Sequence, residues 1–139
     1  MREDHAGRTA LAVHRRSRAP GISVVTAVGE IDLLTAPRLR RALARARDGI
    51  IVLDLARVTF LGAAGLSVML AANDEALWSG RRFCLVGAAG TPRRTLEVSG
   101  VARLVPSYAS LADAISDRES PTGCATPANG TWHRPARLN

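Results

Sequence analysis

The sequence contains no lysine, so its formal net charge of +7 over 139 residues depends on arginine alone. More than half of this excess lies in residues 1–20 and 117–139. Aromatic residues make up only 4%, which leaves few platforms on which nucleic-acid bases could stack. Abundant alanine and arginine without lysine are typical of a GC-rich genome rather than of selection for phosphate contacts. We therefore expect no direct nucleic-acid binding.

Cysteines and long apolar runs are also scarce. Cys84 stands in the apolar run FCLVG and is expected to be a small core residue, whereas Cys124 stands in a polar tail. The two share no metal-ligand spacing, and a disulfide between them is not expected in a reducing compartment. No apolar run approaches the roughly 18–20 residues of a membrane-spanning helix, and the start MREDHAGRTA has no signal-peptide core. These features favour a cytoplasmic protein without a membrane partner.

Groups suited to catalysis are missing from the middle of the chain. His5, His14 and His133 all lie near its ends, so the commonest general base and metal ligand is absent from the expected core. Asp54 ends an apolar run, where a carboxylate is either functional or accepts backbone hydrogen bonds in a turn. The stretch VGAAGTP at 86–92 lacks the spacing of a dinucleotide-binding loop. We expect no enzymatic activity, no cofactor and no bound metal.

Strands and helices alternate through the remaining sequence. Apolar or β-branched runs predict strands at residues 10–16, 22–32, 50–55, 82–87 and 103–106. Helical spacing predicts helices that follow the caps Thr35, Thr91 and Ser107, and one that follows the GAAG turn at 62–65. The order strand-strand-helix-strand-helix-strand-helix-strand-helix indicates an α/β fold, with a mixed, mostly parallel β-sheet and helices packed on it.

The two ends differ in composition from the middle. We expect one domain over residues 10–116, preceded by a flexible N-terminus at 1–9. Residues 117–139 are rich in Pro, Gly, Ser, Thr and Asn and show no periodicity, which predicts a disordered tail. Trp132 within this tail is either an exposed tryptophan or a small docking anchor.

The stretch VTFLGAAGLSVML at 58–70 places a strand, a tight turn and a helix in direct succession. Such a layout presents a side chain at the start of a helix, where unpaired N–H groups and a partial positive charge suit an anion. Here the turn is Gly62-Ala63-Ala64-Gly65, which has no hydroxyl, carboxylate or amine. The pattern is that of a recognition turn without a reactive group.

Four segments resemble, in order and spacing, the STAS domain of the anti-sigma factor antagonist type. They are VVTAVGEIDLLTAPRLRRAL, IIVLDLARVTFLGAAGLSVML, FCLVGAAGTPRRTLEVSGVARLV and SYASLADAI. The resemblance covers about residues 10–116 and implies a STAS-like single domain.

The resemblance implies a role in transcription regulation by partner switching. Such domains bind an anti-sigma factor, commonly a GHKL-type ATPase and serine kinase. The kinase phosphorylates a serine or threonine at the start of the second helix, which breaks the complex. In this sequence Gly62 stands at the family's Asp, Ala63 at its first serine and Ala64 at its phosphoacceptor, and only Gly65 is kept. The phosphoacceptor is therefore missing, and Ser67, three residues later, is a poor substitute inside a helix.

We expect the partner to contact the start of the second helix, the end of the second strand and residues 33–35. The expected contact residues are Glu30, Asp32, Thr35, Gly62, Ala63, Ala64, Gly65 and Leu66. These connections should lie at one edge of a mostly parallel sheet. An alternative is an accessory STAS protein that serves as a scaffold or small-ligand-sensing subunit of a signalling assembly. A weak homodimer is also left open.

Overall fold

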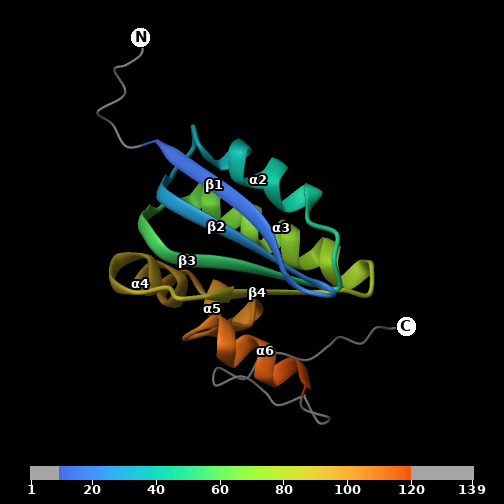
Figure 1. Ribbon diagram of the computed structural model, residues 1–139. Coiled ribbons are helices and arrows are strands. Elements are labelled where there is room, and N and C mark those ends of the chain that lie inside the picture. Colours follow the sequence, from blue (N-terminus) through green and yellow to red (C-terminus); the bar gives the residue numbers. More distant parts are fainter. Residues whose placement is uncertain (1–9, 120–139) are drawn as a thin grey trace.

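The computed structural model describes residues 10–119, which form one five-stranded sheet with helices packed on both faces (Figure 1). The strands are β1 (Leu11–Ala19), β2 (Ile22–Ile31), β3 (Ile50–Leu61), β4 (Arg82–Val86) and β5 (Ser107–Tyr108), side by side in that order. β1 pairs with β2 antiparallel, and all other neighbouring strands are parallel. The predicted mixed, mostly parallel sheet is confirmed.

The helices are α2 (Ala36–Arg45), α3 (Ala63–Trp78), α4 (Gly90–Ser99), α5 (Val101–Leu104) and α6 (Leu111–Glu119). Each parallel strand pair needs a crossover, and α2 and α3 return the chain to the start of the next strand. These two helices cover one face of the sheet, whereas α6 packs on the opposite face (Figure 1). The two strand ends that precede α2 and α3 therefore meet at one edge of the sheet.

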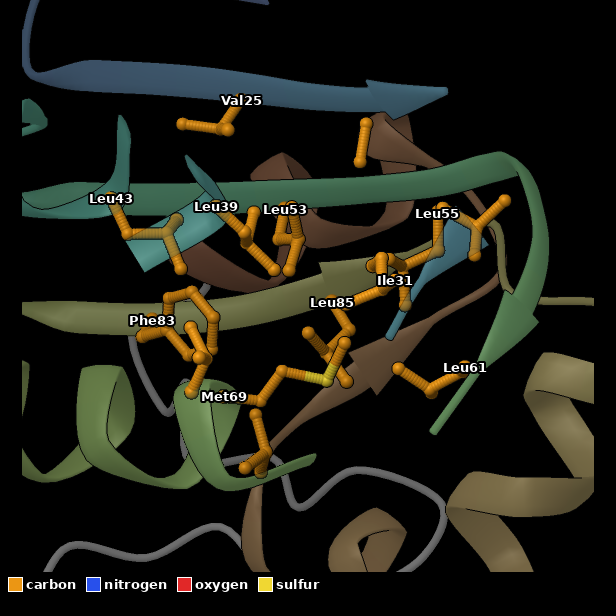
Figure 2. Packing of buried hydrophobic residues seen from close by; sticks show 14 of the residues in the cluster. Val25, Ile31, Leu39, Leu43, Leu53, Leu55, Leu61, Met69, Phe83 and Leu85 are labelled. Carbon is orange, nitrogen blue, oxygen red and sulfur yellow. The ribbon is translucent and has the colours of Figure 1, made fainter. Parts of the chain in front are cut away.

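The main core fills the space between the sheet and the helices α2 and α3. Figure 2 shows Leu53, Phe83 and Leu85 of the sheet packed with Leu39 of α2 and Met69 of α3. Each of these side chains is at most 2% exposed, and full burial of one such side chain contributes about 1.5–3 kcal/mol. This packing fixes both helices to the sheet.

A smaller core lies under α6 on the other face. It contains Cys84, which confirms its prediction as a core residue, and burial raises the pKa of this thiol to about 12. The Tyr108 hydroxyl donates to Asp117 Oδ2 of α6 at 2.5 Å, and Arg82 Nη2 lies 3.5 Å from the same oxygen. Burial, together with this hydrogen bond, raises the pKa of Tyr108 above its usual range. These polar contacts hold α6 against the edge of the sheet.

The region around residue 103 differs from the sequence prediction. The strand expected at 103–106 is wrong, because residues up to Leu104 form the short helix α5 and β5 begins only at Ser107. Gly100 adopts a left-handed φ of +89°, so the chain leaves α4 and enters α5 without a linker. The backbone N–H of Val105 then closes α5 on the Val101 carbonyl at 2.9 Å.

Two predicted helix caps are wrong as well. α4 begins one residue before Thr91, at Gly90. At the start of α6 the cap is Ser110, whose Oγ accepts the backbone N–H of Asp113 at 3.1 Å. Ser107 belongs to β5 instead. A hydroxyl residue near a helix start is therefore not enough to identify the cap.

Parts of the expected domain organisation fall outside the structure. The last helix continues past residue 116 to Glu119. The predicted flexible N-terminus at 1–9, and the tail residues 120–139 with Cys124 and Trp132, lie outside the described residues.

Candidate functional site

The turn between β2 and α2 is held by Asp32 and Thr35. The Asp32 Oδ1 atom accepts the backbone N–H groups of Leu34 and Thr35, each at 3.0 Å. The Thr35 hydroxyl donates to the Glu30 carbonyl at 2.8 Å and accepts the Asp32 N–H at 2.9 Å. Thr35 is the N-cap residue of α2, as predicted, but its side chain makes no hydrogen bond to an N–H of that helix. Its hydroxyl closes the turn onto β2, and Asp32 supports the turn from within.

The same turn presents two leucines to solvent. Leu33 and Leu34 are 78% and 87% exposed, whereas Ile31 before them and Ala36 after them are buried. The leucines therefore form an apolar tip on a short loop whose two ends, Ile31 and Ala36, are buried in the core. Large apolar side chains that gather on a surface commonly mark a contact site.

The turn between β3 and α3 lies directly against the end of β2. Ile31 pairs in register with Leu61, and its carbonyl accepts the Gly62 N–H at 2.9 Å. The Gly62 carbonyl in turn accepts the Leu66 N–H at 3.2 Å, which starts α3. The predicted succession of strand, turn and helix is confirmed, and Ile31 joins this turn to the Asp32–Thr35 turn.

Gly65 allows α3 to approach β2 this closely. Its position is buried, and a Cβ atom there would lie 2.5 Å from Ile31 Cγ2 and 2.6 Å from Leu61 Cδ1. Both distances are far below an ordinary contact between carbon atoms. The first turn of α3 can therefore stand beside the end of β2 only when this position lacks a side chain.

The start of α3 is open and uncharged. Ala63 is exposed and Ala64 is half-buried. No side chain of residues 10–119 caps this helix start. Leu66 is half-buried and packs against the main core, so it offers only part of its surface to a partner. The structure thus brings together the predicted residues of both turns, with Leu66 and Gly65 mainly in supporting positions.

Phe60 is a surface residue of this site that the sequence analysis missed. It is 44% exposed and pairs in register with Glu30 at the end of β2. Its position in the sequence could have indicated this exposure. Phe60 lies two residues before Gly62, and side chains alternate along a strand, so Phe60 faces away from the side on which Leu61 is buried. We define the turn surface as Leu33, Leu34, Phe60, Gly62, Ala63 and Ala64.

Asp54 has a structural role at a bend in β3. Its Oδ1 atom accepts the backbone N–H of Ala56 at 2.9 Å, next to the irregularity in the pairing of β2 with β3. Of the two alternatives given for Asp54, a functional carboxylate or an acceptor of backbone hydrogen bonds, the structure therefore shows the acceptor. Among residues 10–119, no group of three or more His, Cys, Asp or Glu side chains is placed to hold a metal ion. The same residues include no helix long and apolar enough to cross a membrane.

The fold and the turn surface define a small α/β domain that presents an uncharged turn beside exposed leucines at one edge of a mixed sheet. The chain belongs to the STAS domain family, whose sequence model matches residues 15–114.

Comparisons with individual proteins place it near anti-sigma factor antagonists. It is 32% identical over 99 residues to the anti-sigma-F factor antagonist RsfB of Mycobacterium tuberculosis, covering 69% of this chain and 80% of RsfB. A crystal structure of an anti-sigma factor antagonist from Mycobacterium paratuberculosis superimposes with a TM-score of 0.72 at 31% identity, covering 80% of this chain and 96% of that one. Phosphorylated SpoIIAA of Bacillus shares the fold at 21% identity, with a TM-score of 0.60 and coverage of 78% and 100%.

Proposed function

We propose that this protein is an anti-sigma factor antagonist that binds its anti-sigma factor through the turn surface. The observation that carries the proposal is the joined pair of turns around Ile31, with two leucines and an open helix start on their outer side. Homology to RsfB supports the class of partner. Binding would release a sigma factor for transcription, in the cytoplasm, and the protein would act by binding rather than by catalysis.

The chemistry of the turn surface suits a tight protein contact. Gly62, Ala63 and Ala64 bring no charge that would have to be desolvated. Their small side chains also permit close approach of a partner's backbone. Burial of each exposed leucine against a partner would contribute about 1.5–3 kcal/mol before the costs of association are subtracted.

Ala64 stands where the family resemblance places a phosphorylated serine or threonine, so the proposed antagonist would lack this switch. A kinase of the GHKL type, the partner that the family resemblance implies, would find no hydroxyl at this position. SpoIIAA, which shares this fold, has been observed in both unphosphorylated and phosphorylated forms. In the present protein the complex would persist in the presence of ATP, because the usual site of the switch is absent.

Co-purification tests this proposal. The full chain, carrying an affinity tag, is expressed in its native host and recovered with its bound proteins, which are identified by mass spectrometry. We expect an anti-sigma factor with an ATPase domain, and a stable complex when both proteins are purified and mixed. Size-exclusion chromatography of the free chain also reports whether copies associate. Recovery of a bound small molecule without any anti-sigma factor would contradict the proposal and favour an accessory, ligand-sensing role.

A further inference from the structure

Exposed arginines are numerous on β1 and α2. The exposed arginines on β1, on α2 and directly after α2 are Arg15, Arg16, Arg18, Arg38, Arg40, Arg41, Arg45 and Arg47. Within residues 10–119 no ion pair joins any of them to a carboxylate, whereas Arg82 and Arg93 each have an acidic partner. β1 and α2 therefore carry unbalanced positive charge within the described residues.

Three of these arginines form a row along α2. Arg38, Arg41 and Arg45 recur at spacings of three and four residues, which places them on one side of a helix over about 10 Å. Leu39 and Leu43 are buried on the other side against the main core. Arg41 and Arg45 therefore face solvent, whereas Arg38 reaches back to β1 at one end of the row. Like charges at this spacing repel one another, so the row weakens the helix unless an anionic surface meets it.

β1 extends this row. Arg38 Nη1 donates to the Leu11 carbonyl at 2.5 Å, which fixes the first turn of α2 beside the start of β1. From there α2 runs alongside β1 (Figure 1). Arg15 pairs with Val25, whose side chain faces the main core, so Arg15 projects on the same side of the sheet as α2. We define the arginine surface as Arg15, Arg38, Arg41 and Arg45.

The arginine surface adjoins the turn surface. α2 begins at Ala36, immediately after the turn that presents Leu33 and Leu34. No aromatic residue occurs among residues 10–47, so the surface lacks the stacking groups with which proteins hold single-stranded nucleic acid. A protein that covers the leucines would extend naturally onto the arginine row.

We propose that the arginine surface is an electrostatic docking site for an acidic patch on the anti-sigma factor, beside the apolar contact made by the turn surface. This inference depends on the proposed function and specifies the chemistry of the partner. Exposed charges at the rim of an interface mainly accelerate association and make it dependent on salt, with less effect on dissociation.

The test measures association rates with the purified anti-sigma factor recovered by co-purification, by stopped-flow fluorescence from about 50 to about 500 mM NaCl. The test variant is Arg41→Glu with Arg45→Glu, since glutamate is a good helix former. The matched control is Arg94→Glu with Arg103→Glu, which makes the same change of net charge at exposed positions on α4 and α5. We expect the test variant to associate about tenfold more slowly at low salt and to lose most of the salt dependence. The control should change much less, and dissociation rates should be similar for all three proteins.

Other outcomes would overturn either the proposed function or the role of the arginine surface. If the wild type binds no anti-sigma factor, the proposed function fails and this inference fails with it. If the wild type binds but the two variants associate equally fast, only the arginine surface is overturned. If a short duplex DNA displaces the anti-sigma factor from the wild type at about 150 mM NaCl but not from the test variant, the surface belongs to nucleic acid and the inference is overturned.

Discussion

Gly65 of α3 lies so close to Ile31 of β2 that an added Cβ would stand 2.5 Å from the Ile31 Cγ2 atom. Ile31 also joins the two turns of the site, because its carbonyl accepts the Gly62 N–H. The packing at one glycine therefore sets the position of the whole turn surface.

Gly65→Ala should destabilise the domain and weaken partner binding together. The added methyl group must displace Ile31 or Leu61, and overpacking of this kind costs about 1–3 kcal/mol. Thermal unfolding should show a midpoint several degrees lower. The matched control is Gly49→Ala, because a Cβ at Gly49 would make only an ordinary contact of 3.8 Å with the Gly21 carbonyl. If the Gly65→Ala variant unfolds at the same temperature as the wild type, α3 can move away from β2 at little cost in free energy.

Asp32 should be needed for the shape of the turn rather than for its charge. Asp32→Ala removes the acceptor of two backbone N–H groups, and loss of a comparable capping side chain costs about 1 kcal/mol. Asp32→Asn keeps an oxygen at that position and should retain most of the stability and binding. Chemical denaturation and calorimetric titration with the anti-sigma factor measure the two effects. Equal loss in both variants would indicate that the negative charge itself matters.

The exposed leucines should contribute to binding and not to folding. Leu33→Ser with Leu34→Ser should leave the thermal midpoint nearly unchanged, because both side chains are largely in solvent. The variant should bind the anti-sigma factor at least tenfold more weakly, which corresponds to about 1.4 kcal/mol. Val98→Ser with Leu104→Ser removes two other exposed apolar side chains, on α4 and α5, and should bind normally. Similar affinity for both double variants would remove the turn surface from the interface.

A phosphorylation switch should be restorable at the turn. If the anti-sigma factor is a kinase, as proposed, incubation of the wild type with it and ATP should leave the intact mass unchanged. Ala64→Ser with Gly62→Asp restores the hydroxyl and acid of the family pattern. Gly62 has an extended backbone, and its new side chain requires only a small shift of the Phe60 ring, which lies 3.1 Å from the added Cβ. Phosphate on the introduced hydroxyl would add about −1.5 to −2 charges to the interface, so the partner should be released.

The control for this switch is Gly62→Asp alone, which should gain no mass and keep its partner. Phosphate on the wild-type chain would show that the acceptor has moved, and Ser67, which is exposed on α3, is the first residue to map.

Stability should fall at high pH because of two groups near α6. The pKa values of Cys84 and Tyr108 are both raised in the folded protein, mainly by burial. Groups with a raised folded pKa stabilise the protein fully below their unfolded pKa, and this contribution is lost as the pH rises further. The free energy of unfolding should therefore decline above about pH 9, where the unfolded thiol begins to ionise. Cys84→Ala with Tyr108→Phe should show a smaller decline between about pH 9 and about pH 11 in denaturant titrations. An unchanged slope would mean that other groups dominate.

The sequence by itself determined the order of most elements and the nature of the turn. Runs such as IIVLDL and FCLVG are apolar enough to indicate buried strands without knowledge of their neighbours. The turn Gly62-Ala63-Ala64-Gly65 has no reactive side chain in any conformation. The mixed, mostly parallel character of the sheet followed from helices placed between strands. The STAS resemblance agreed with this local pattern.

Only the tertiary structure decided which side chains act at the site. Thr35 lies at a helix start in the sequence, but its hydroxyl bonds to Glu30 because β2 and α2 meet at a sharp turn. Residues 103–106 contain apolar residues that suit a strand, yet Gly100 turns the chain directly into α5. The exposure of Phe60 and the alignment of Arg15 with the α2 arginines depend on strand register and helix placement. These properties arise from contacts between distant segments, which no local pattern of residues specifies.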